Sequence, residues 1–277
     1  MASSVPIPVV LIFVALIVAP IAIAIILRFT VERIWPAEGS RRRSVETNYF
    51  AYLLLSVTTI ASALPLNALT VYLANRLGSG VIVLPSHGAW LVAGFVVFFI
   101  VQDLVEYLFH RIEHTVPALW SLHSLHHSDK QLDASTSFLH HWAIYLIHAI
   151  CVSLPVALIF KVPSIDLLLW ALISNHVFLM HANLTWDFGR VSWLITSPRY
   201  HRIHHSATPE HFGSNFASIL PVWDVLFGTQ HKDWRQGEAP AVGLEGEPAA
   251  GLFDLTFWPV REQLRRIVPR PLQQPPA

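Results

Sequence analysis

Two histidine triplets with the same spacing are the feature that most constrains this sequence. One lies in SLHSLHHSD (121–129) and the other in YHRIHHS (200–206). In an α-helix, residues at positions i, i+3 and i+4 share one face, so each triplet can direct three rings to one place. Charged imidazoles repel one another, whereas neutral imidazole is the commonest metal ligand. The spacing therefore predicts a metal centre whose ligands include His123, His126, His127, His201, His204 and His205.

A third cluster, HRIEH, lies just before the first triplet and contributes His110 and His114. On a helix over 103–114, these two histidines fall on one stripe with Asp103 and Tyr107. His110 and His114 are one turn apart, so they can bind the same ion or adjacent ions. Asp103 is placed to accept a proton from the second nitrogen of a ligand ring, or to orient a ring through Tyr107, as partners of metal-bound histidines do.

The other histidines divide into candidate ligands and structural residues. His181 ends an apolar run, directly before Ala182 and Asn183, and we expect it to be a ligand. His176 and His141 are further candidates, and His140 is a weaker one. We expect a structural or exposed position for the remaining four, which are His87, His148, His211 and His231.

The composition indicates a membrane protein. Charged residues make up only 13% of the chain and hydrophobic residues 53%, where a soluble domain has about 25% charged residues. The formal net charge is zero, which gives no electrostatic support for a nucleic-acid partner. Cys151 is the single cysteine, so a disulfide within the chain and a thiolate metal site are both excluded.

Five apolar runs predict an all-α, polytopic membrane protein with four to five transmembrane helices. About 20 apolar residues span a bilayer. No Lys or Arg precedes the first run and its apolar core is long, which favours a retained helix over a signal peptide. The last two runs form a hairpin that either crosses the bilayer or only dips into it. The runs are 7–27, 49–75, 89–102 with a polar continuation to 114, 142–160 and 165–184.

Basic residues predict the orientation of these helices. The loop after the first run is rich in arginine, and such loops usually face the cytoplasm. HRIEH, both triplets and His181 then return to that same face, where they form a helical, histidine-rich cap. We expect a bacterial inner membrane with the histidine clusters on the cytoplasmic side. The arginines are Arg28, Arg33, Arg41, Arg42 and Arg43.

Three regions follow from this organisation. Residues 1–87 form an N-terminal transmembrane region with two spans, and residues 88–235 form the catalytic domain. Residues 236–277 contain a loop, a mixed aromatic and basic segment, and a tail of disordered composition. The mixed segment, 252–268, predicts either a helix that lies in the headgroup region or a surface helix that packs on the domain.

The number of histidines favours two metal ions. Nine or more are too many for one tetrahedral zinc. Imidazole alone does not identify the metal, but two irons can activate dioxygen. One alternative is a zinc-dependent membrane hydrolase with metal-activated water and a base such as Glu113, Asp129 or Glu210. Another is a non-enzymatic metal or haem-binding protein, although a carrier would place its polar residues near the bilayer midplane.

The ordered set of motifs resembles the fatty acid hydroxylase / sterol desaturase superfamily, over about half of the chain. One segment, FLHHWAI (138–144), departs from the pattern because it keeps His141 but lacks the Arg and Pro found in relatives. The matching elements are D-x3-Y-x2-HR-x2-H at 103–114, W-x2-H-x2-HH at 120–127, His-Ala-Asn at 181–183, SPRYHRIHH at 197–205, Asn215, and WDVLFGT at 223–229.

This resemblance implies a non-haem di-iron oxidoreductase that hydroxylates or desaturates a lipid, such as a sterol or a fatty-acyl chain. Dioxygen and a separate electron-transfer protein would be its other partners. Asp103, Tyr107 and Asn183 would support the ligands. The expected iron ligands are His110, His114, His123, His126, His127, His181, His201, His204 and His205.

Overall fold

The computed structural model describes residues 18–37, 45–77, 80–162, 164–246, 249 and 251–267, and these residues are mostly helical. The first apolar run is described only from residue 18, and Arg41–Arg43 lie outside the described residues. The longer helical elements are α2 (Ala19–Ile26), α4 (Val45–Leu77), α5 (Trp90–Thr115), α6 (Pro117–His127), α8 (Leu154–Ile159), α9 (Ser164–Ile173), α10 (His176–His181), α11 (Pro198–His204) and α13 (Gly251–Ile267).

Shorter elements connect these helices. Two of them, η2 and η4, are π-helical turns, and η4 joins α7 to α8 into one continuous rod. The short elements are η2 (Leu27–Val31), α3 (Glu32–Ile34), η3 (Ala134–Phe138), α7 (Ile144–His148), η4 (Ala149–Ser153), η5 (Gly189–Trp193), η6 (Pro209–His211) and α12 (Val222–Leu226).

α5 is the central helix, and it confirms the helix expected over 89–114. Within the described part of the chain, it is the one helix that is both long enough and apolar enough to cross a membrane. Its 26 residues correspond to about 39 Å. The apolar segments Ile144–Ile159 and Ile165–His181 are shorter than α5, and a crossing typically takes about 20 residues, so whether they cross the bilayer or only enter it stays open.

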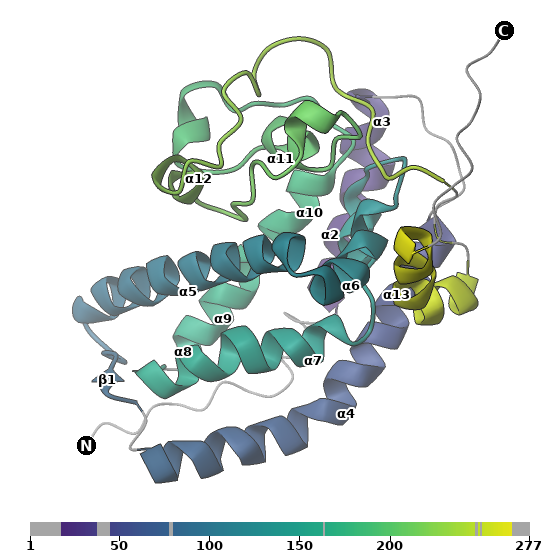
Figure 1. Ribbon diagram of the computed structural model, residues 1–277. Helices are drawn as coiled ribbons and strands as arrows, with labels where there is room; N and C mark the ends of the chain where they lie inside the picture. Colours follow the sequence, from purple (N-terminus) through teal and green to yellow (C-terminus); the bar gives the residue numbers. More distant parts are fainter. Residues whose placement is uncertain are drawn as a thin grey trace, which may run out of the picture.

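The described residues contain one sheet, of two strands, and an isolated antiparallel β-bridge between Ser206 and Val242. β1 (Ile82–Val83) pairs in parallel with β2 (Phe160–Lys161). Leu84, Phe98, Val156 and Phe160 pack together beside it. The pairing holds the connection before α5 against the connection after α8, so these two connections lie at the same end of the molecule (Figure 1).

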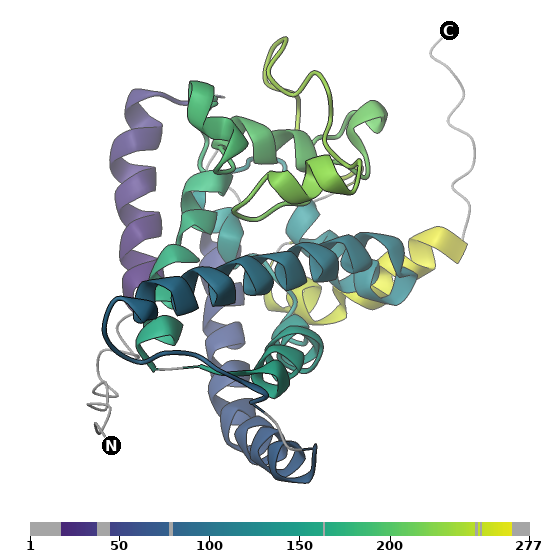
Figure 2. The same ribbon diagram turned by 90° about the vertical axis from the view of Figure 1, so that its left-hand side faces the viewer.

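The helices form two layers with α5 between them. α4 and the α7–α8 rod lie on one side of α5, and the segment that contains α11 and α12 covers the other side as a cap (Figures 1 and 2). α6 follows α5 closely because Val116 ends α5 in an extended conformation and Pro117 starts α6. The first triplet therefore lies directly beside HRIEH.

The second triplet also lies on a helix with a defined start. Ser197 is the N-cap of α11, and its hydroxyl accepts a hydrogen bond from the backbone N–H of Tyr200 at 3.2 Å. Pro198 occupies the first turn, where a missing N–H costs nothing. α11 packs against α10, which carries His181 at its end.

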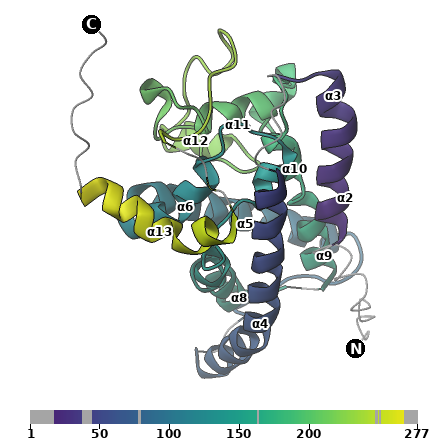
Figure 3. The ribbon, with the colours of Figure 1, turned by 90° about the vertical axis from the view of Figure 1, so that its right-hand side faces the viewer.

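α13 packs one face against α6 and α4, as Figure 3 shows. Leu255 and Trp258 are buried on that face, and the Trp258 indole N–H donates to Ser124 Oγ at 3.0 Å. The opposite face exposes Phe253 and Phe257. The segment therefore forms the expected helix and packs on the domain, while an apolar face remains uncovered by the described residues.

Candidate metal centre

Nine histidines converge in two neighbouring groups, and they are the nine that the motifs predict. In each group, one ring nitrogen of every member lies within 4.8 Å of those of the others. The five-histidine group consists of His110, His114, His123, His127 and His204. The four-histidine group consists of His126, His181, His201 and His205.

Each triplet is divided between the two groups. His126 and His127 are consecutive residues in different groups, and so are His204 and His205. The rings of His127 and His205 stack across the boundary, with centroids 4.2 Å apart and planes at 16°. The H-x2-HH spacing therefore serves two adjacent sites, which is the arrangement a dinuclear centre needs.

The four-histidine group has ring nitrogens at the separation expected around one ion. The Nε2 atom of His181 lies 2.9 Å from that of His126 and 3.0 Å from that of His201. The Nδ1 atom of His181 is 2.8 Å from the carbonyl oxygen of Val177, which can only accept, so Nδ1 carries the proton. Nε2 of His181 then presents a lone pair to the other rings. A cation with metal–nitrogen bonds of about 2 Å fits between nitrogens spaced in this way.

Backbone carbonyls orient the rings of the five-histidine group. His110 Nδ1 donates to the carbonyl of Phe216 at 2.7 Å, and His204 Nδ1 donates to that of Ser214 at 2.9 Å. Such bonds fix the tautomer and leave Nε2 as the metal-binding atom. Three Nε2 atoms in this group are buried and have no hydrogen-bond partner among the described residues. They belong to His114, His127 and His204. Buried polar atoms rarely stay unsatisfied, so these residues fit a metal ion.

Burial holds the rings in the form that binds metal. It lowers the pKa of the six triplet histidines well below the ordinary value, and neighbouring histidines lower it further in every one of these rings. A low-dielectric interior disfavours the charged imidazolium, and a second positive charge nearby disfavours it more. The rings are therefore neutral at neutral pH and can offer lone pairs.

Asn215 shapes the loop that supplies the orienting carbonyls. It lies between Ser214 and Phe216 and has a left-handed backbone, with φ of 56°. Its amide donates to the carbonyl of Tyr200 at 3.0 Å and accepts from the backbone N–H of His231 at 2.9 Å. Asn adopts this conformation more readily than other residues that carry a Cβ atom.

Asp103 and Tyr107 contact the cap and not a histidine ring. The Asp103 carboxylate accepts from the indole N–H of Trp223 at 2.8 Å and from the backbone N–H of Leu220 at 3.1 Å. The Tyr107 hydroxyl lies 2.7 Å from Thr229 Oγ1. Both residues therefore fasten the segment after the second triplet to α5.

Asp224, the acidic residue of the WDVLFGT motif, supports the site although it contacts no clustered histidine side chain. Its carboxylate accepts from the Tyr200 hydroxyl at 2.8 Å and from the backbone N–H groups of Phe216 and Ala217. It thereby links α11 to the carbonyl that orients His110. A buried carboxylate with several donors rigidifies its surroundings, and its place in the WDVLFGT motif was the signal for it.

Asn183 is held by the N-terminal segment, which the sequence patterns did not connect with the site. Its backbone N–H donates to Glu32 at 3.2 Å, and the same carboxylate oxygen accepts from the N–H of Ala134 at 2.8 Å. Arg28 pairs with Asp133 beside it. These contacts join segments far apart in sequence, so no spacing within the chain could have revealed them.

The weaker histidine candidates lie outside both groups. His176 Nε2 donates to the carbonyl of Thr196 at 2.8 Å, and His141 Nε2 donates to that of Thr256 at 3.2 Å. His140 comes nearer, because its ring stacks on His126 at 4.2 Å, and burial lowers its pKa to about 4. His148 bonds Glu106 at 2.8 Å, in agreement with the structural position expected for it.

Comparison with known proteins agrees with the motif pattern. The family model described as "Fatty acid hydroxylase" matches residues 95–229. This segment, slightly less than half of the chain, is thus similar to the fatty acid hydroxylase family. All nine clustered histidines, Asp103 and Asp224 lie inside it. The resemblance inferred from the motifs is therefore confirmed.

Three relatives show the range of proteins that share this segment. Alkylglycerol monooxygenase of Danio rerio is 32% identical over 150 residues, which are 53% of this chain and 32% of the relative. Ornithine lipid hydroxylase of Rhizobium tropici is 27% identical over 154 residues, 56% of this chain and 46% of the relative. Methylsterol monooxygenase 1-3 of Arabidopsis thaliana is 30% identical over 147 residues, 50% of this chain and 48% of the relative. The chain thus spans at most about half of each, and no solved structure matches it.

Proposed function

We propose that the chain is a membrane-bound, non-haem di-iron oxidoreductase that hydroxylates a lipid with dioxygen and external electrons. The observation that carries this proposal is the division of nine buried histidines into two adjacent groups. Neutral imidazoles in this number suit two ions of higher coordination number better than one tetrahedral ion. All three relatives described above are named as monooxygenases or hydroxylases of lipids, which supports hydroxylation over desaturation.

The protein's own contribution is to hold the ligands and to exclude water. The five- and four-histidine groups would each hold one iron, and the pair would supply the reduction of dioxygen that inserts oxygen into a C–H bond. The carbonyls of Phe216, Ser214 and Val177 keep the rings of three ligands aimed inward. Burial of the triplets keeps bulk water from the site.

We infer which side of the membrane the histidine groups face from the basic residues near them and from the two ends of α5. Arg28 and Arg33 lie on the short helices that precede the site, and Arg28 contacts Asp133 next to the first triplet. Basic residues near spans favour the cytoplasmic side. β1 and β2 lie at the opposite end of α5, which is apolar over its first half. We infer that the histidine groups face the cytoplasm, where a separate electron-transfer protein would reach them.

Metal analysis of the full chain, purified from membranes, tests the proposal. We expect one iron in each group, hence two per chain, and a lipid product that forms only with dioxygen and a reductant. Mössbauer spectroscopy of protein grown on ⁵⁷Fe identifies the two sites. Zinc in both sites, with activity that needs no dioxygen, would instead select a hydrolase in which Glu113, 3.5 Å from His123 Nδ1, is the nearest candidate base.

Single substitutions separate the two sites. His114→Ala removes a member of the five-histidine group, and His205→Ala removes a member of the four-histidine group. Each should lower the iron content toward one per chain and abolish the oxidised lipid. His87→Ala is the matched control, because His87 is exposed in the connection before α5. Full iron content in either ligand variant would contradict the assignment of that group.

A further inference from the structure

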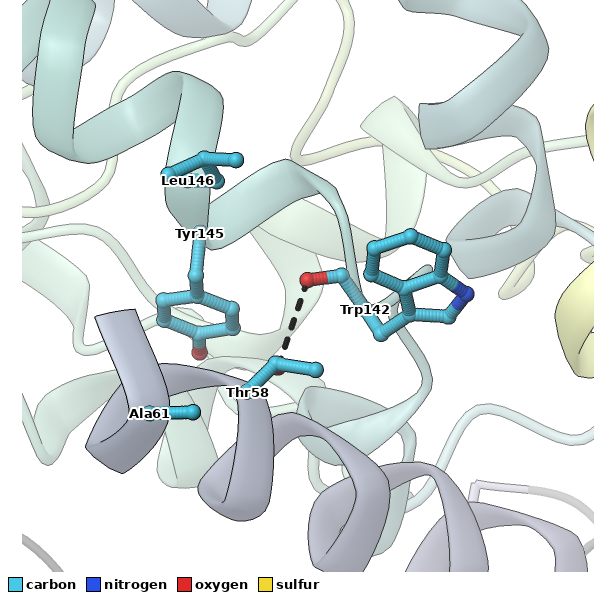
Figure 4. Close-up of a pocket in the computed structure, with 5 residues that line it drawn as sticks. All are labelled: Thr58, Ala61, Trp142, Tyr145 and Leu146. Atoms are coloured by element: carbon cyan, nitrogen blue, oxygen red, sulfur yellow. Dashed lines mark hydrogen bonds between the residues drawn. The ribbon is translucent and has the colours of Figure 1, made fainter.

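A cavity of about 280 Å³ lies between α4 and the start of α7, and none of the nine clustered histidines lines it (Figure 4). Its lining residues are Thr58, Ala61, Trp142, Tyr145 and Leu146. The one hydroxyl on the α4 wall is already used, because Thr58 Oγ1 donates to the carbonyl of Leu55 at 2.9 Å and lies 3.5 Å from that of Trp142. The cavity therefore presents mainly carbon atoms and no charged side chain.

The cavity lies where a membrane lipid can reach it. Ala61, Tyr145 and Leu146 are exposed at the surface of helices on the side of α5 opposite the cap. Val57 on α4 and Ile150 on the α7–α8 rod are exposed apolar neighbours along the chain. In a bilayer, such a surface meets hydrocarbon, so the occupant of the cavity is drawn from the acyl region and not from water.

Two aromatic layers connect the cavity with the metal centre. The ring of Tyr145, which forms one wall, lies 6.4 Å from that of His140. His140 in turn stacks on His126, a member of the four-histidine group, at 4.2 Å and 17°. A chain in the cavity is thus separated from a candidate ligand only by Tyr145 and His140.

The size of the cavity restricts what it holds. Sites that enclose a whole small ligand usually measure about 300–1,000 Å³. This cavity is slightly smaller and has no charged group to bind a lipid headgroup, so it fits a part of a lipid. A flexible chain can enter such a cavity in part, whereas a rigid sterol nucleus cannot bend to do so.

We propose that this cavity is a subsite for a segment of the substrate's alkyl or acyl chain, and that Ala61 limits how much chain it admits. The proposal rests on the proposed function for the identity of the chain as substrate. Binding of hydrocarbon in the cavity is independent of catalysis, so the two can fail separately. Trp142 and Tyr145 are the residues that the bound chain contacts.

Photo-crosslinking tests the subsite directly. The full chain is placed in phosphatidylcholine vesicles that contain a fatty acid with a mid-chain diazirine, and the labelled residues are mapped by mass spectrometry. We expect the label on the cavity residues, chiefly Trp142 and Tyr145. Ala61→Trp fills the cavity and should reduce this label severalfold. Leu53→Trp is the control, because Leu53 is exposed on α4 and does not line the cavity.

A second variant guards against a folding defect. Leu146→Trp fills the cavity from the opposite wall and should reduce the label as Ala61→Trp does, with metal content unchanged in both. Label spread evenly over exposed apolar residues, or undiminished in both filled variants, overturns the subsite. Specific label without any dioxygen-dependent product supports the subsite and shows that the proposed function alone has failed.

Discussion

At the scale of single residues, the site depends on groups that hold the histidines as much as on the histidines themselves. Carbonyls of Phe216, Ser214 and Val177 fix three ring tautomers, and Asp224 fixes the loop that carries two of these carbonyls. Partners of this kind commonly change metal affinity by about 10- to 100-fold when they are removed. Loss of a supporting residue should therefore be visible in metal content before it is visible in the fold.

Asn215 offers a test of this dependence. Asn215→Ala puts an alanine in a left-handed backbone conformation, which its Cβ atom disfavours, and removes the two hydrogen bonds of the Asn215 side chain. The conformation costs about 1–2 kcal/mol and each of the two lost bonds about 1 kcal/mol, so we expect a loss of roughly 3–4 kcal/mol of stability. Thermal unfolding and iron content in detergent measure it. Asn215→Gly keeps the backbone freedom and should lose less; equal losses in the two variants would remove the conformational part of the explanation.

Glu32 gives a prediction about pH. It lies beyond the first apolar run, and burial, helped by nearby Asp133, raises its pKa from 4.5 to about 7. For an acid with a raised pKa, the folded state favours the protonated form. Its stabilising contribution is present below pH 4.5 and is lost as the pH rises toward 7. Glu32→Gln keeps an oxygen that can accept from Ala134 and Asn183 but never becomes charged.

The stability difference between Glu32→Gln and the unmodified protein should therefore grow with pH. We expect nearly equal unfolding temperatures at pH 4.5 and a variant that is more stable by up to about 3 kcal/mol at pH 8. Unfolding followed by circular dichroism across this window measures the difference. A difference that does not change with pH would mean that Glu32 has an ordinary pKa.

At the scale of elements, the histidine spacing predicted α5, α6 and α11, because a metal site demands rings on one helical face. The turn at Val116 and Pro117 and the cap at Ser197 then place those helices. The sequence could not predict the roles of Asp103 and Tyr107 in the same way. A helical stripe shows which residues share a face, but the partner on that face comes from the cap, more than 100 residues later.

α13 is the element whose second face stays unpartnered among the described residues. We infer that it lies in the headgroup region, with Trp258 directed to the protein and Phe253 and Phe257, 73% and 49% exposed, directed to lipid. A spin label at Phe257→Cys, in a Cys151→Ser background, should collide more often with dissolved oxygen than with a water-soluble nickel complex. The reverse order would place this face in water.

The inward face of α13 should behave differently. Trp258→Ala removes a buried indole and its hydrogen bond to Ser124, and such truncations cost about 3–5 kcal/mol. Phe253→Ala, on the exposed face, should change the unfolding temperature in detergent little. If both variants were equally destabilised, the exposed face of α13 would have to be covered by another part of the chain.

At the scale of the whole molecule, the sequence predicted that the motifs lie together, and the two histidine groups show that they do. That the arginine-rich loop and the later runs bring them to one face of a membrane stays a prediction. The N-terminal anchor of Glu32 and Arg28 was not predictable, since its partners lie about 100 residues or more away along the chain. The same holds for β1 and β2, whose two-residue strands carry no periodic pattern.

The proposed topology makes a prediction about the two ends of the molecule. Ser86 is exposed in the connection before α5, near β1, and Glu210 is exposed in the cap. Each is changed to cysteine in a Cys151→Ser background and treated with a membrane-impermeant maleimide. In bacterial cells, Ser86→Cys should react in spheroplasts, whereas Glu210→Cys should react only in inverted vesicles. α5 joins these two ends of the molecule. If both cysteines reacted from the same side, α5 would not cross the membrane. The cap and the β1 end would then lie on the same side of the bilayer.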